Sequence, residues 1–319
     1  MEKNMTSLKT GIVILNYNTS EETKKCVYSI RKFEKQYTIY IVDNCSSDHS
    51  WDDLYHTFHN DHDIVLLRAS RNGGYSYGNN IGITKCLEDN CDIIYIVNSD
   101  IELLNSTFTI MTKTLINNPH CMIIGPSVVD NHGNEVQLAK KKLTLRNFIY
   151  GRHPFCNIPF FKKKVDRLYD IPVNQRFFIF QGMVSGCCFG IRATDFKQIH
   201  YFDENVFLYY EEDILICKLA SHERKAIIDH DAKVWHKESV STKKSGFAFI
   251  RYHRWNSVTY YLYEYLQLNF FIRTLIFIWN TVTWLLLSIR SRTYRELLHD
   301  FIKKQTKLLF KRYDTSIKK

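Results

Sequence analysis

The sequence predicts an α/β fold in which a mostly parallel sheet is covered by helices on both faces. Short, wholly apolar segments alternate with helical patterns through the first hundred residues. Strands that are buried on both faces appear in a sequence as continuous apolar runs, which is typical of parallel sheets. Polar residues follow the ends of three of these runs, and ligands bind at such strand ends in open α/β sheets.

The expected elements can be given by residue range. Strands are expected at 11–15, 37–42, 63–67, 92–97 and 225–234, and helices at 20–33, 49–59, 75–87 and 214–220. Residues 140–176 are basic and contain Pro154, Pro159 and Pro172. Long segments of this composition are often functional or disordered, so we expect a long insertion or mobile loop there.

Composition excludes several classes of protein. The chain of 319 residues is 45% hydrophobic and 24% charged, which is an ordinary globular balance. Its formal net charge of +10 favours anionic partners, but no nucleic-acid-binding motif accompanies that charge, so we expect no nucleic acid partner. The nine cysteines form no CxxC pair, and residues 1–10 lack the apolar core of a secretory signal peptide. We therefore expect reduced thiols in a cytosolic protein.

Three polar segments of the first half are candidate ligand contacts. Asp43 follows a strand, where it could accept hydrogen bonds from a ribose or a base, or cap a turn. Residues 72–80 form a Gly-rich loop that opens a helix, which suits a phosphate but also an ordinary turn. Asp100 closes the segment Asn98-Ser99-Asp100 after an apolar strand. A carboxylate there could hold a hard divalent cation that bridges two phosphates, or could lie in a polar turn.

Two further segments lie in the second half. Glu211, Glu212 and Asp213 begin a predicted helix, where acidic side chains suit the helix dipole. One of them could instead act as a general base in a pocket walled by aromatic residues. His236 follows a predicted strand and is a candidate metal ligand only if the fold brings it beside Asp100.

In their order along the chain, these segments resemble glycosyltransferase family 2, which has the GT-A fold, and most closely its rhamnosyltransferase-like branch of bacterial surface-polysaccharide synthesis. The resemblance covers roughly residues 10–260. The donor half matches in VILNYN (13–18), VDNCSSD (42–48), NGGYSYGNN (72–80) and VNSD (97–100). The acceptor half matches in SGCCFGIRATDF (185–196), FDENVFLYYEED (202–213) and VWHKESVS (234–241).

The resemblance implies a role for each matching residue. Asp213 would be the base that deprotonates the acceptor, with Glu212 in support, and Asp100 and His236 would bind Mg²⁺ or Mn²⁺. Arg254 lies in the segment 251–256, which resembles a motif that follows the catalytic region in such enzymes. The residues implied to bind the nucleotide sugar are Asn16, Asn18, Asp43, Asn44, Gly74, Asn79, Asn80, Asn98 and Arg254.

The implied activity is inverting sugar transfer from a nucleotide-diphosphate donor to an acceptor hydroxyl. The donor would be dTDP-rhamnose or a UDP-hexose, and the acceptor a lipid-linked glycan of capsule, exopolysaccharide or cell-wall synthesis, on a polyprenyl-diphosphate carrier. A sugar nucleotidyltransferase would carry a Gly-rich basic loop after the first strand, where Asn16-Tyr17-Asn18-Thr19 stands instead. A non-catalytic carbohydrate-binding or scaffold protein is the other alternative, and it predicts loss of Asp100, Asp213 or His236.

The C-terminal region is predicted to associate with a membrane. We expect residues 1–245 to form the catalytic domain, with a donor half at about 10–130 and an acceptor half at about 177–245, and 246–319 to form an aromatic and basic helical region. The uncharged run 274–289 would span only ~24 Å as a helix, so an interfacial helix is favoured over a full span. The enzyme would then be a cytoplasmic protein, peripheral on the inner face of the membrane. The residues expected at the lipid headgroups are Tyr260, Tyr261, Tyr263, Tyr265, Trp279, Trp284 and the tail lysines and arginines Lys303, Lys304, Lys307, Lys311, Arg312, Lys318 and Lys319.

Overall fold

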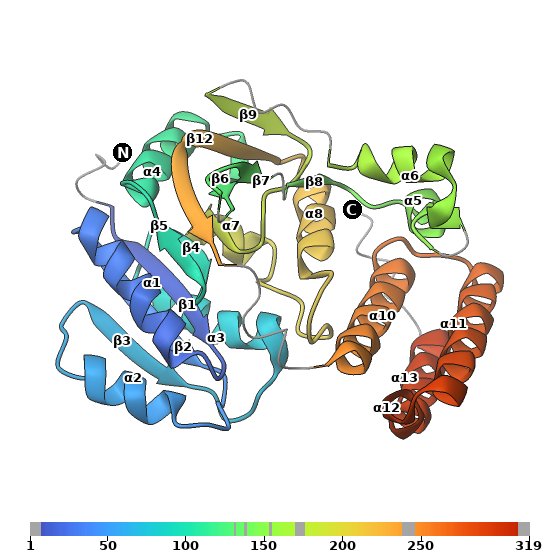
Figure 1. Ribbon diagram of the computed structural model, residues 1–319. Helices are drawn as coiled ribbons and strands as arrows, with labels where there is room; N and C mark the ends of the chain where they lie inside the picture. Colours follow the sequence, from blue (N-terminus) through green and yellow to red (C-terminus); the bar gives the residue numbers. More distant parts are fainter. Residues whose placement is uncertain are drawn as a thin grey trace.

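A computed structural model describes residues 8–130, 132–136, 139–152, 155–169, 176–237 and 246–311. The first half alternates strands and helices as predicted, with ends that differ by one or two residues (Figure 1). Its elements are β1 (Thr10–Asn16), α1 (Ser20–Phe33), β2 (Tyr37–Asp43), α2 (Ser50–Phe58), β3 (Ile64–Arg68), α3 (Gly74–Glu88), β4 (Ile93–Asn98), β5 (Ile101–Leu103), α4 (Thr107–Asn117) and β6 (Cys121–Val129).

The second half completes the sheet and adds shorter elements. These are β7 (Glu135–Val136), β8 (Lys140–Lys141), α5 (Leu145–Tyr150), the 3₁₀ helix η2 (Phe155–Asn157), α6 (Pro159–Asp166), β9 (Phe177–Phe180), β10 (Gly182–Met183), β11 (Cys188–Arg192), α7 (Ala193–Gln198), α8 (Glu211–Ser221) and β12 (Lys225–His236).

The expectation of an irregular insertion at 140–176 was wrong for the part that the structure describes. Two short helices, α5 and α6, form there because aromatic side chains pack between them. The Phe161 ring lies 4.5 Å from that of Tyr150 and 5.7 Å from that of Phe155. Pro159 occupies the first turn of α6, where its missing N–H breaks no helical hydrogen bond. Pro154 and Pro172 lie outside the described residues.

The central sheet is mixed and mostly parallel. Its order is β3-β2-β1-β4-β11-β6-β12-β5, with β7 on β6 and β9 on β12. The first four strands run parallel, β11 is antiparallel to both β4 and β6, and β12 is parallel to β6. The carboxyl ends of β1, β2 and β4 therefore meet at one edge, which is where the predicted polar residues follow each strand.

Helices cover both faces of the sheet, as predicted. Along β1, Ile12 and Ile14 face a core that includes residues of α1, α2 and α4. Val13, between them, faces the opposite core, to which α3, α7 and α8 contribute. Successive strand residues point to opposite faces, so a run of apolar residues fills both cores at once.

The C-terminal region is a helical unit of α10 (Phe247–Glu264), α11 (Phe270–Arg290), α12 (Arg292–Glu296) and α13 (Leu298–Phe310). Asp203, which precedes α8 in the α/β part of the molecule, accepts hydrogen bonds from the hydroxyls of Tyr260 (2.8 Å) and Tyr265 (2.7 Å), which join α10 to that part. Trp284 of α11 stacks on Phe301 of α13 with ring centroids 4.1 Å apart.

The expected headgroup aromatics are mostly core residues, so that expectation was wrong for four of them. Tyr260, Tyr261, Tyr263 and Trp284 are at most 5% exposed. Tyrosine and tryptophan suit a helix interface as well as a headgroup layer when the hydroxyl or indole N–H finds a partner. Here the Trp284 indole donates to the carbonyl of Tyr294 at 3.2 Å. Arg312, Lys318 and Lys319 of the basic tail lie outside the described residues.

One face of α11 remains apolar and exposed. Its residues recur at spacings of three and four, which places them in one stripe along the helix. The stripe consists of Phe271, Leu275, Ile278, Val282, Leu285, Leu286 and Ile289, each at least 41% exposed. The helix of 21 residues is about 32 Å long, and by length and composition it could cross a membrane. The helix therefore extends beyond residues 274–289, the uncharged run whose length had predicted a helix too short to cross a membrane.

Candidate active site

The polar residues at the ends of β1 and β2, Asn16 and Asp43, are joined in one hydrogen-bond network. Asp43 is fully buried, and its carboxylate accepts from Asn16 Nδ2 (2.8 Å), the Ser46 hydroxyl (2.5 Å) and the Ser46 N–H (3.0 Å). Asn16 is also fully buried, and its side-chain oxygen Oδ1 accepts from the hydroxyls of Thr19 and Thr23. Asn16 therefore fixes the orientation of the Asp43 carboxylate at the edge of the sheet.

The adjoining loops are tied to each other by asparagine side chains. Asn18 has a positive φ of 55° and exchanges hydrogen bonds with Ser47, joining the loops after β1 and β2. Asn44 donates from Nδ2 to Asn72 Oδ1 and to the carbonyl of Gly74, both at 3.1 Å. The loops after β1, β2 and β3 thus hold one another before any ligand binds.

Gly74 requires the absence of a side chain. Its φ of +87° is unfavourable for other residues, and an added Cβ would collide with the carbonyl oxygen of Phe207. The next residue, Tyr75, donates its N–H to that same carbonyl at 2.9 Å. The Gly-rich loop is therefore packed directly against the segment that precedes the acidic residues 211–213.

Asn79 and Asn80 lie inside the molecule rather than on an open ligand surface. Asn79 is fully buried and donates to the carbonyl of Tyr75. Asn80 is 9% exposed; it donates to the Phe202 carbonyl and to Glu204, and its Oδ1 accepts the Phe202 N–H at 3.1 Å. In this arrangement Asn80 joins α3 to the segment that leads to the acidic residues.

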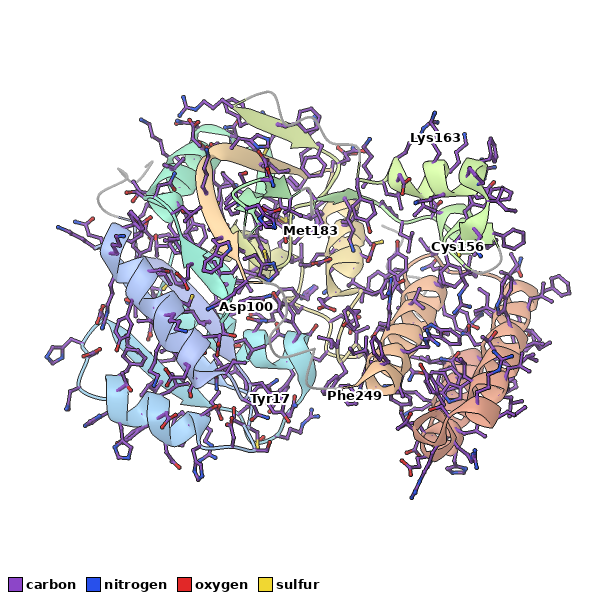
Figure 2. The ribbon with its side chains drawn as sticks, in the orientation of Figure 1. Tyr17, Asp100, Cys156, Lys163, Met183 and Phe249 are labelled. Carbon is purple, nitrogen blue, oxygen red and sulfur yellow. The ribbon has the colours of Figure 1, made fainter. Side chains whose placement is uncertain are left out.

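Asp100 and His236 are brought together by strand pairing. His236 ends β12 and pairs with Ile101 of β5, the residue after Asp100. The Asp100 Oδ1 and His236 Nε2 atoms lie 3.4 Å apart, near the ~3 Å that separates adjacent ligands of an octahedral Mg²⁺-sized cation. Both side chains are largely buried. Asp100 lies near the middle of the α/β part of the molecule (Figure 2).

This pair fits a divalent cation that takes its remaining ligands from a bound phosphate group. Among the described residues, no group of three His, Cys, Asp or Glu side chains could hold a metal ion alone. A shallow pocket beside Asp100 is also lined by Glu22, Lys25, Ser99, Glu102 and Lys237. Carboxylate oxygen and imidazole nitrogen both bind Mn²⁺-type cations, so the donor set suits the predicted metal.

The acidic residues at the start of α8 have different environments. Asp213 is 3% exposed and pairs with the Lys140 ammonium at 2.8 Å, while Glu212, with its side chain 34% exposed, lies 3.0 Å from the same ammonium. Burial raises the pKa of Asp213, and the charge of Lys140 opposes that rise. Burial together with Glu212 raises the pKa of Glu211 to about 8.

Lys140 is a residue of this site that the sequence did not reveal. It lies 73 residues before Asp213, in the segment expected to be irregular, and reaches the carboxylates because β8 pairs with β10. The positive charge of Lys140, 2.8 Å from Asp213, offsets part of the cost of burying that carboxylate in its ionised form. The basic composition of the insertion was the one available signal, but it does not single out Lys140.

A short segment connects the cation pair with the acidic cluster. The Asn98 N–H, at the end of β4, donates to the carbonyl of Cys187 at 2.8 Å. One residue earlier, the Gly186 N–H donates to Glu212 Oε1 at 3.0 Å and the Gly186 carbonyl accepts from the Tyr75 hydroxyl at 2.8 Å. Strand β4, the Gly-rich loop and Glu212 therefore all bond to residues 186–187.

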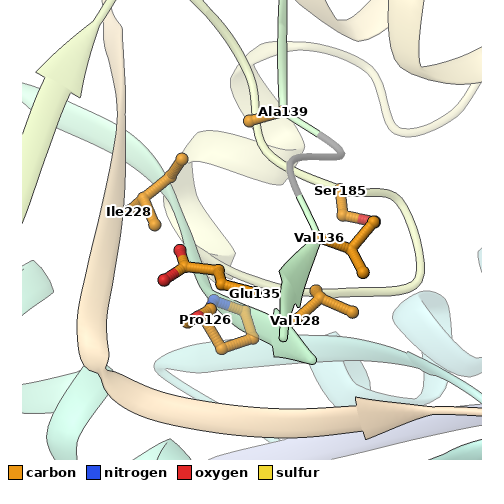
Figure 3. Close-up of a pocket in the computed structure, with 8 residues that line it drawn as sticks. Pro126, Val128, Glu135, Val136, Ala139, Ser185 and Ile228 are labelled. Atoms are coloured by element: carbon orange, nitrogen blue, oxygen red, sulfur yellow. The ribbon is translucent and has the colours of Figure 1, made fainter. Parts of the chain in front are cut away.

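Two further features are Arg254, which the sequence predicted as a ligand contact, and a small pocket between β6, β7 and β12. Arg254 is an exposed residue of α10, and its charge opposes the burial-driven rise in the pKa of Tyr210, the residue before Glu211. The small hollow in Figure 3 lies between β6, β7 and β12, and it has room for about one water molecule. Of its lining, Ser185 alone adjoins the 186–187 segment.

Together, the mixed sheet and the polar residues at its strand ends form an α/β fold with a candidate ligand site at the carboxyl ends of β1, β2 and β4. The family model of glycosyl transferase family 2 matches residues 11–199, which is more than half of the chain. The chain therefore belongs to glycosyltransferase family 2.

One named relative and one solved structure are similar to this chain. The low-salt glycan biosynthesis hexosyltransferase Agl10 of Haloferax volcanii is 27% identical over 218 residues, which cover 67% of this chain and 62% of that protein. Among solved structures, GalNAc-T7 with UDP, GalNAc and Mn²⁺ matches with a TM-score of 0.55 at 14% identity, over 73% of this chain and 44% of that one.

A second solved structure covers more of the chain. The mannosyltransferase PcManGT from Pyrobaculum calidifontis, in complex with GDP-Man and Mn²⁺, matches with a TM-score of 0.52 at 12% identity, over 94% of this chain and 73% of that one. At such identities the two structures show the fold alone, and that fold is the GT-A fold. The predicted fold class is thereby confirmed.

Proposed function

We propose that this protein is an inverting glycosyltransferase that moves a sugar from a nucleoside-diphosphate donor to an acceptor hydroxyl. One observation carries the proposal: residues 186–187 bond to Asn98 on one side and to Glu212 on the other. This joins Asn98, two residues before Asp100 of the candidate cation pair, to a candidate base through two neighbouring residues. A transfer reaction needs such a spacing between the group that stabilises the leaving diphosphate and the group that accepts the proton.

The donor would bind at the carboxyl ends of β1, β2 and β4. Asp43 would accept hydrogen bonds from the base or ribose, with Asn16 orienting its carboxylate. Asn18, Asn44, Gly74 and Asn98 would shape the loops around the nucleotide. In this proposal Asn79 and Asn80 act indirectly, since their buried side chains bond to protein groups.

Asp100 and His236 would hold a divalent cation, Mg²⁺ or Mn²⁺. The Mn²⁺ in both solved GT-A structures supports a divalent cation at this kind of site. When bound, it would neutralise negative charge on the donor diphosphate. The 3.4 Å separation of the two side chains leaves the other coordination positions to the phosphate oxygens and water.

Glu212 is the better candidate for the base, in place of the Asp213 expected from sequence. Asp213 is 3% exposed and bound to Lys140, so an acceptor hydroxyl has little access to it. Glu212 is more exposed, and its Oε1 is aimed by the Gly186 N–H. Asp213 would then hold Lys140 in place, and Lys140 would hold Glu212 in position through their ion pair.

The proposed reaction is one direct displacement. The acceptor oxygen attacks the anomeric carbon while the bond from that carbon to the diphosphate oxygen breaks. The leaving diphosphate takes the bonding electron pair, and Glu212 takes the proton of the acceptor hydroxyl. Attack from the face opposite the leaving group inverts the anomeric centre, and positive charge develops on the sugar ring during transfer.

The finer proposals concern substrates and location. We propose dTDP-rhamnose or a UDP-hexose as donor and a polyprenyl-diphosphate-linked glycan of surface-polysaccharide synthesis as acceptor. The exposed apolar stripe of α11 supports a cytoplasmic enzyme that is peripheral on the inner face of the membrane. Trp284 and Asn280 are buried against neighbouring helices, so the opposite face of α11 packs on the rest of the protein. A helix with one packed face and one exposed apolar face is better suited to lie in the membrane interface than to cross the bilayer.

Turnover of the donor tests this function. The protein would be incubated with Mn²⁺ and each of UDP-glucose, UDP-galactose, dTDP-rhamnose and GDP-mannose, with and without membrane extract, and release of the nucleoside diphosphate measured. We expect release with one donor, stimulated by the extract, and a loss of about 10²–10⁴-fold in Glu212→Gln.

The Asp213→Asn variant separates the two candidate bases. Both variants should bind the nucleotide as the wild type does. If Asp213→Asn abolishes turnover while Glu212→Gln retains it, the base is Asp213. If no donor is turned over under any condition, the protein is a non-catalytic member of its family and the proposal fails.

A further inference from the structure

The segment 202–210 lies between α3 and α10 and is hydrogen-bonded to both helices. On the α3 side, Asn80 Nδ2 donates to the Phe202 carbonyl and Asn80 Oδ1 accepts the Phe202 N–H, both at 3.1 Å. Farther along, the Tyr75 N–H donates to the Phe207 carbonyl at 2.9 Å. Figure 1 shows this part of the chain below α8, between α3 and α10. The segment is therefore held at two points by the helix that the Gly-rich loop opens.

Asp203 attaches the segment to α10. Its Oδ2 accepts the hydroxyls of Tyr260 at 2.8 Å and Tyr265 at 2.7 Å, while its Oδ1 accepts the N–H and the side-chain amide of Asn205. Burial acts to raise the pKa of Asp203, but the hydrogen bonds from these three residues bring it below its ordinary value. Asp203 is thus ionised at neutral pH, and hydrogen bonds to a carboxylate are stronger than those between neutral groups.

Two more contacts with α10 lie closer to the acidic residues of α8. The Ser257 hydroxyl donates to the Leu208 carbonyl at 2.9 Å. The ring of Phe207 stacks on that of His253, with ring centroids 4.2 Å apart. Phe207 therefore contacts α3 through its carbonyl and α10 through its ring, so both helices determine the path of the chain at this point.

The two residues that end the segment have an unfavourable backbone conformation. Tyr209 and Tyr210 have φ values of 68° and 69°, in the left-handed region that residues other than glycine rarely adopt. Such a conformation persists only where the surrounding structure holds it. Tyr210 is also the N-cap of α8, so its backbone sets the direction in which Glu211 and Glu212 begin the helix. The contacts with α3 and α10 thus hold the backbone that presents the candidate base.

We propose that Asp203 is a positioning residue for sugar transfer, through which α10 holds the backbone that presents Glu212. Asp203 would touch neither the donor nor the acceptor. It would tie the 202–210 segment to the C-terminal helical unit, so that Glu212 keeps its place relative to the donor site. This proposal rests on the proposed glycosyltransferase function, and it assigns the C-terminal helical unit a part in the reaction besides membrane association.

Removing the two phenol hydroxyls tests this role. Tyr260→Phe and Tyr265→Phe, made singly and together, keep both rings and lose only the hydrogen bonds to Asp203. Tyr263→Phe is the matched control, because Tyr263 is a buried residue of the same helix whose hydroxyl donates to the Arg273 carbonyl inside the C-terminal unit. Hydrogen–deuterium exchange of the full chain reports on the segment without a substrate, and turnover reports on the reaction.

We expect residues 207–214 to exchange at least about tenfold faster in the double variant, because two hydrogen bonds to a charged group are lost. Tyr263→Phe should leave that exchange unchanged. Turnover would be measured with Mn²⁺, membrane extract and the donor that the wild type uses. There kcat should fall at least about tenfold in the double variant, since a small displacement of a catalytic group slows transfer.

The KM for the donor and the stoichiometry of nucleotide binding should stay as in the wild type. A loss of folded protein would instead lower that stoichiometry together with kcat, which separates a positioning role from a merely structural one.

Three results would overturn the role of Asp203. Unchanged exchange at residues 207–214 in the double variant would show that Asp203 does not hold the segment. Faster exchange with an unchanged kcat would make the attachment structural only. An equal fall of kcat in Tyr263→Phe would assign the effect to the helical unit in general. All three leave the proposed glycosyltransferase function standing, whereas a wild type that turns over no donor refutes that function and this role with it.

Discussion

Replacing Lys140 by methionine tests whether the buried ion cluster holds the acceptor side of the active site together. Lys140 approaches Asp213 at 2.8 Å and Glu212 at 3.0 Å, and its side chain is 16% exposed. Breaking a buried pair by removing one partner costs about 3–5 kcal/mol, because the other charge stays buried. Since Glu212 is partly solvated, we expect a loss of about 3 kcal/mol of unfolding free energy at pH 7.

The pH dependence of that loss has a defined sign. Burial raises the pKa of Asp213, and replacing Lys140 removes the largest influence that opposes that rise. A carboxyl group whose pKa is raised in the folded state contributes stability below its unfolded pKa, ~4, and loses it as the pH rises through its folded pKa. The deficit of Lys140→Met relative to wild type should therefore shrink as the pH is lowered from 7 toward 4.5.

The assay is urea denaturation at both pH values, followed by far-UV circular dichroism. Lys141→Met is the matched control, because Lys141 is the exposed neighbour on the same strand and the charge change is identical. A deficit no larger than that of Lys141→Met, or one that is the same at both pH values, would refute the ion-cluster argument.

Four further predictions concern other parts of the molecule. Gly74→Ala should lower the unfolding free energy by at least about 1–2 kcal/mol. In thermal unfolding its loss should exceed that of Gly133→Ala, because both glycines have positive φ but only Gly74 lies against a backbone carbonyl. Burial raises the pKa of Glu211 from its ordinary 4.5 to about 8, so the wild type should lose stability as the pH rises through that window, and pH titration of Glu211→Gln should show a smaller loss. Trp284→Ala should cost about 3–5 kcal/mol in chemical denaturation, because Trp284 is fully buried among α11, α12 and α13. Phe271→Ser, at a 71% exposed position, should leave stability nearly unchanged but reduce co-sedimentation with anionic vesicles.

The first half of the fold was predictable because local patterns determine it. Helix α1 has the predicted bounds, Ser20–Phe33, since its apolar residues fall on one face and acidic and basic residues occupy its first and last turns. The apolar run before Asn98 could be placed as a buried strand for the same kind of reason. Such signals depend on neighbours within one or two turns of the chain.

The acceptor side was less predictable because it depends on distant contacts. Lys140 reaches Asp213 across 73 residues and Arg152 reaches Asn280 across 128, and neither pairing has a local pattern. The tyrosines of α10 were misplaced for a different reason. A helix rich in tyrosine has the same sequence pattern at a membrane interface and between other helices. Only the partners of its hydroxyl groups, such as Asp203, distinguish the two environments.

Binding of a nucleotide with a metal tests the central claim most directly. Thermal unfolding would be followed with UDP, dTDP and GDP, with and without Mn²⁺, for wild type and Asp100→Ala. A ligand at about 100 times its dissociation constant adds ~2.7 kcal/mol of apparent stability. We predict that one nucleotide stabilises the wild type in a Mn²⁺-dependent way and that Asp100→Ala loses this effect. No stabilisation by any nucleotide, or full stabilisation of Asp100→Ala, would contradict the donor site proposed at Asp100 and His236.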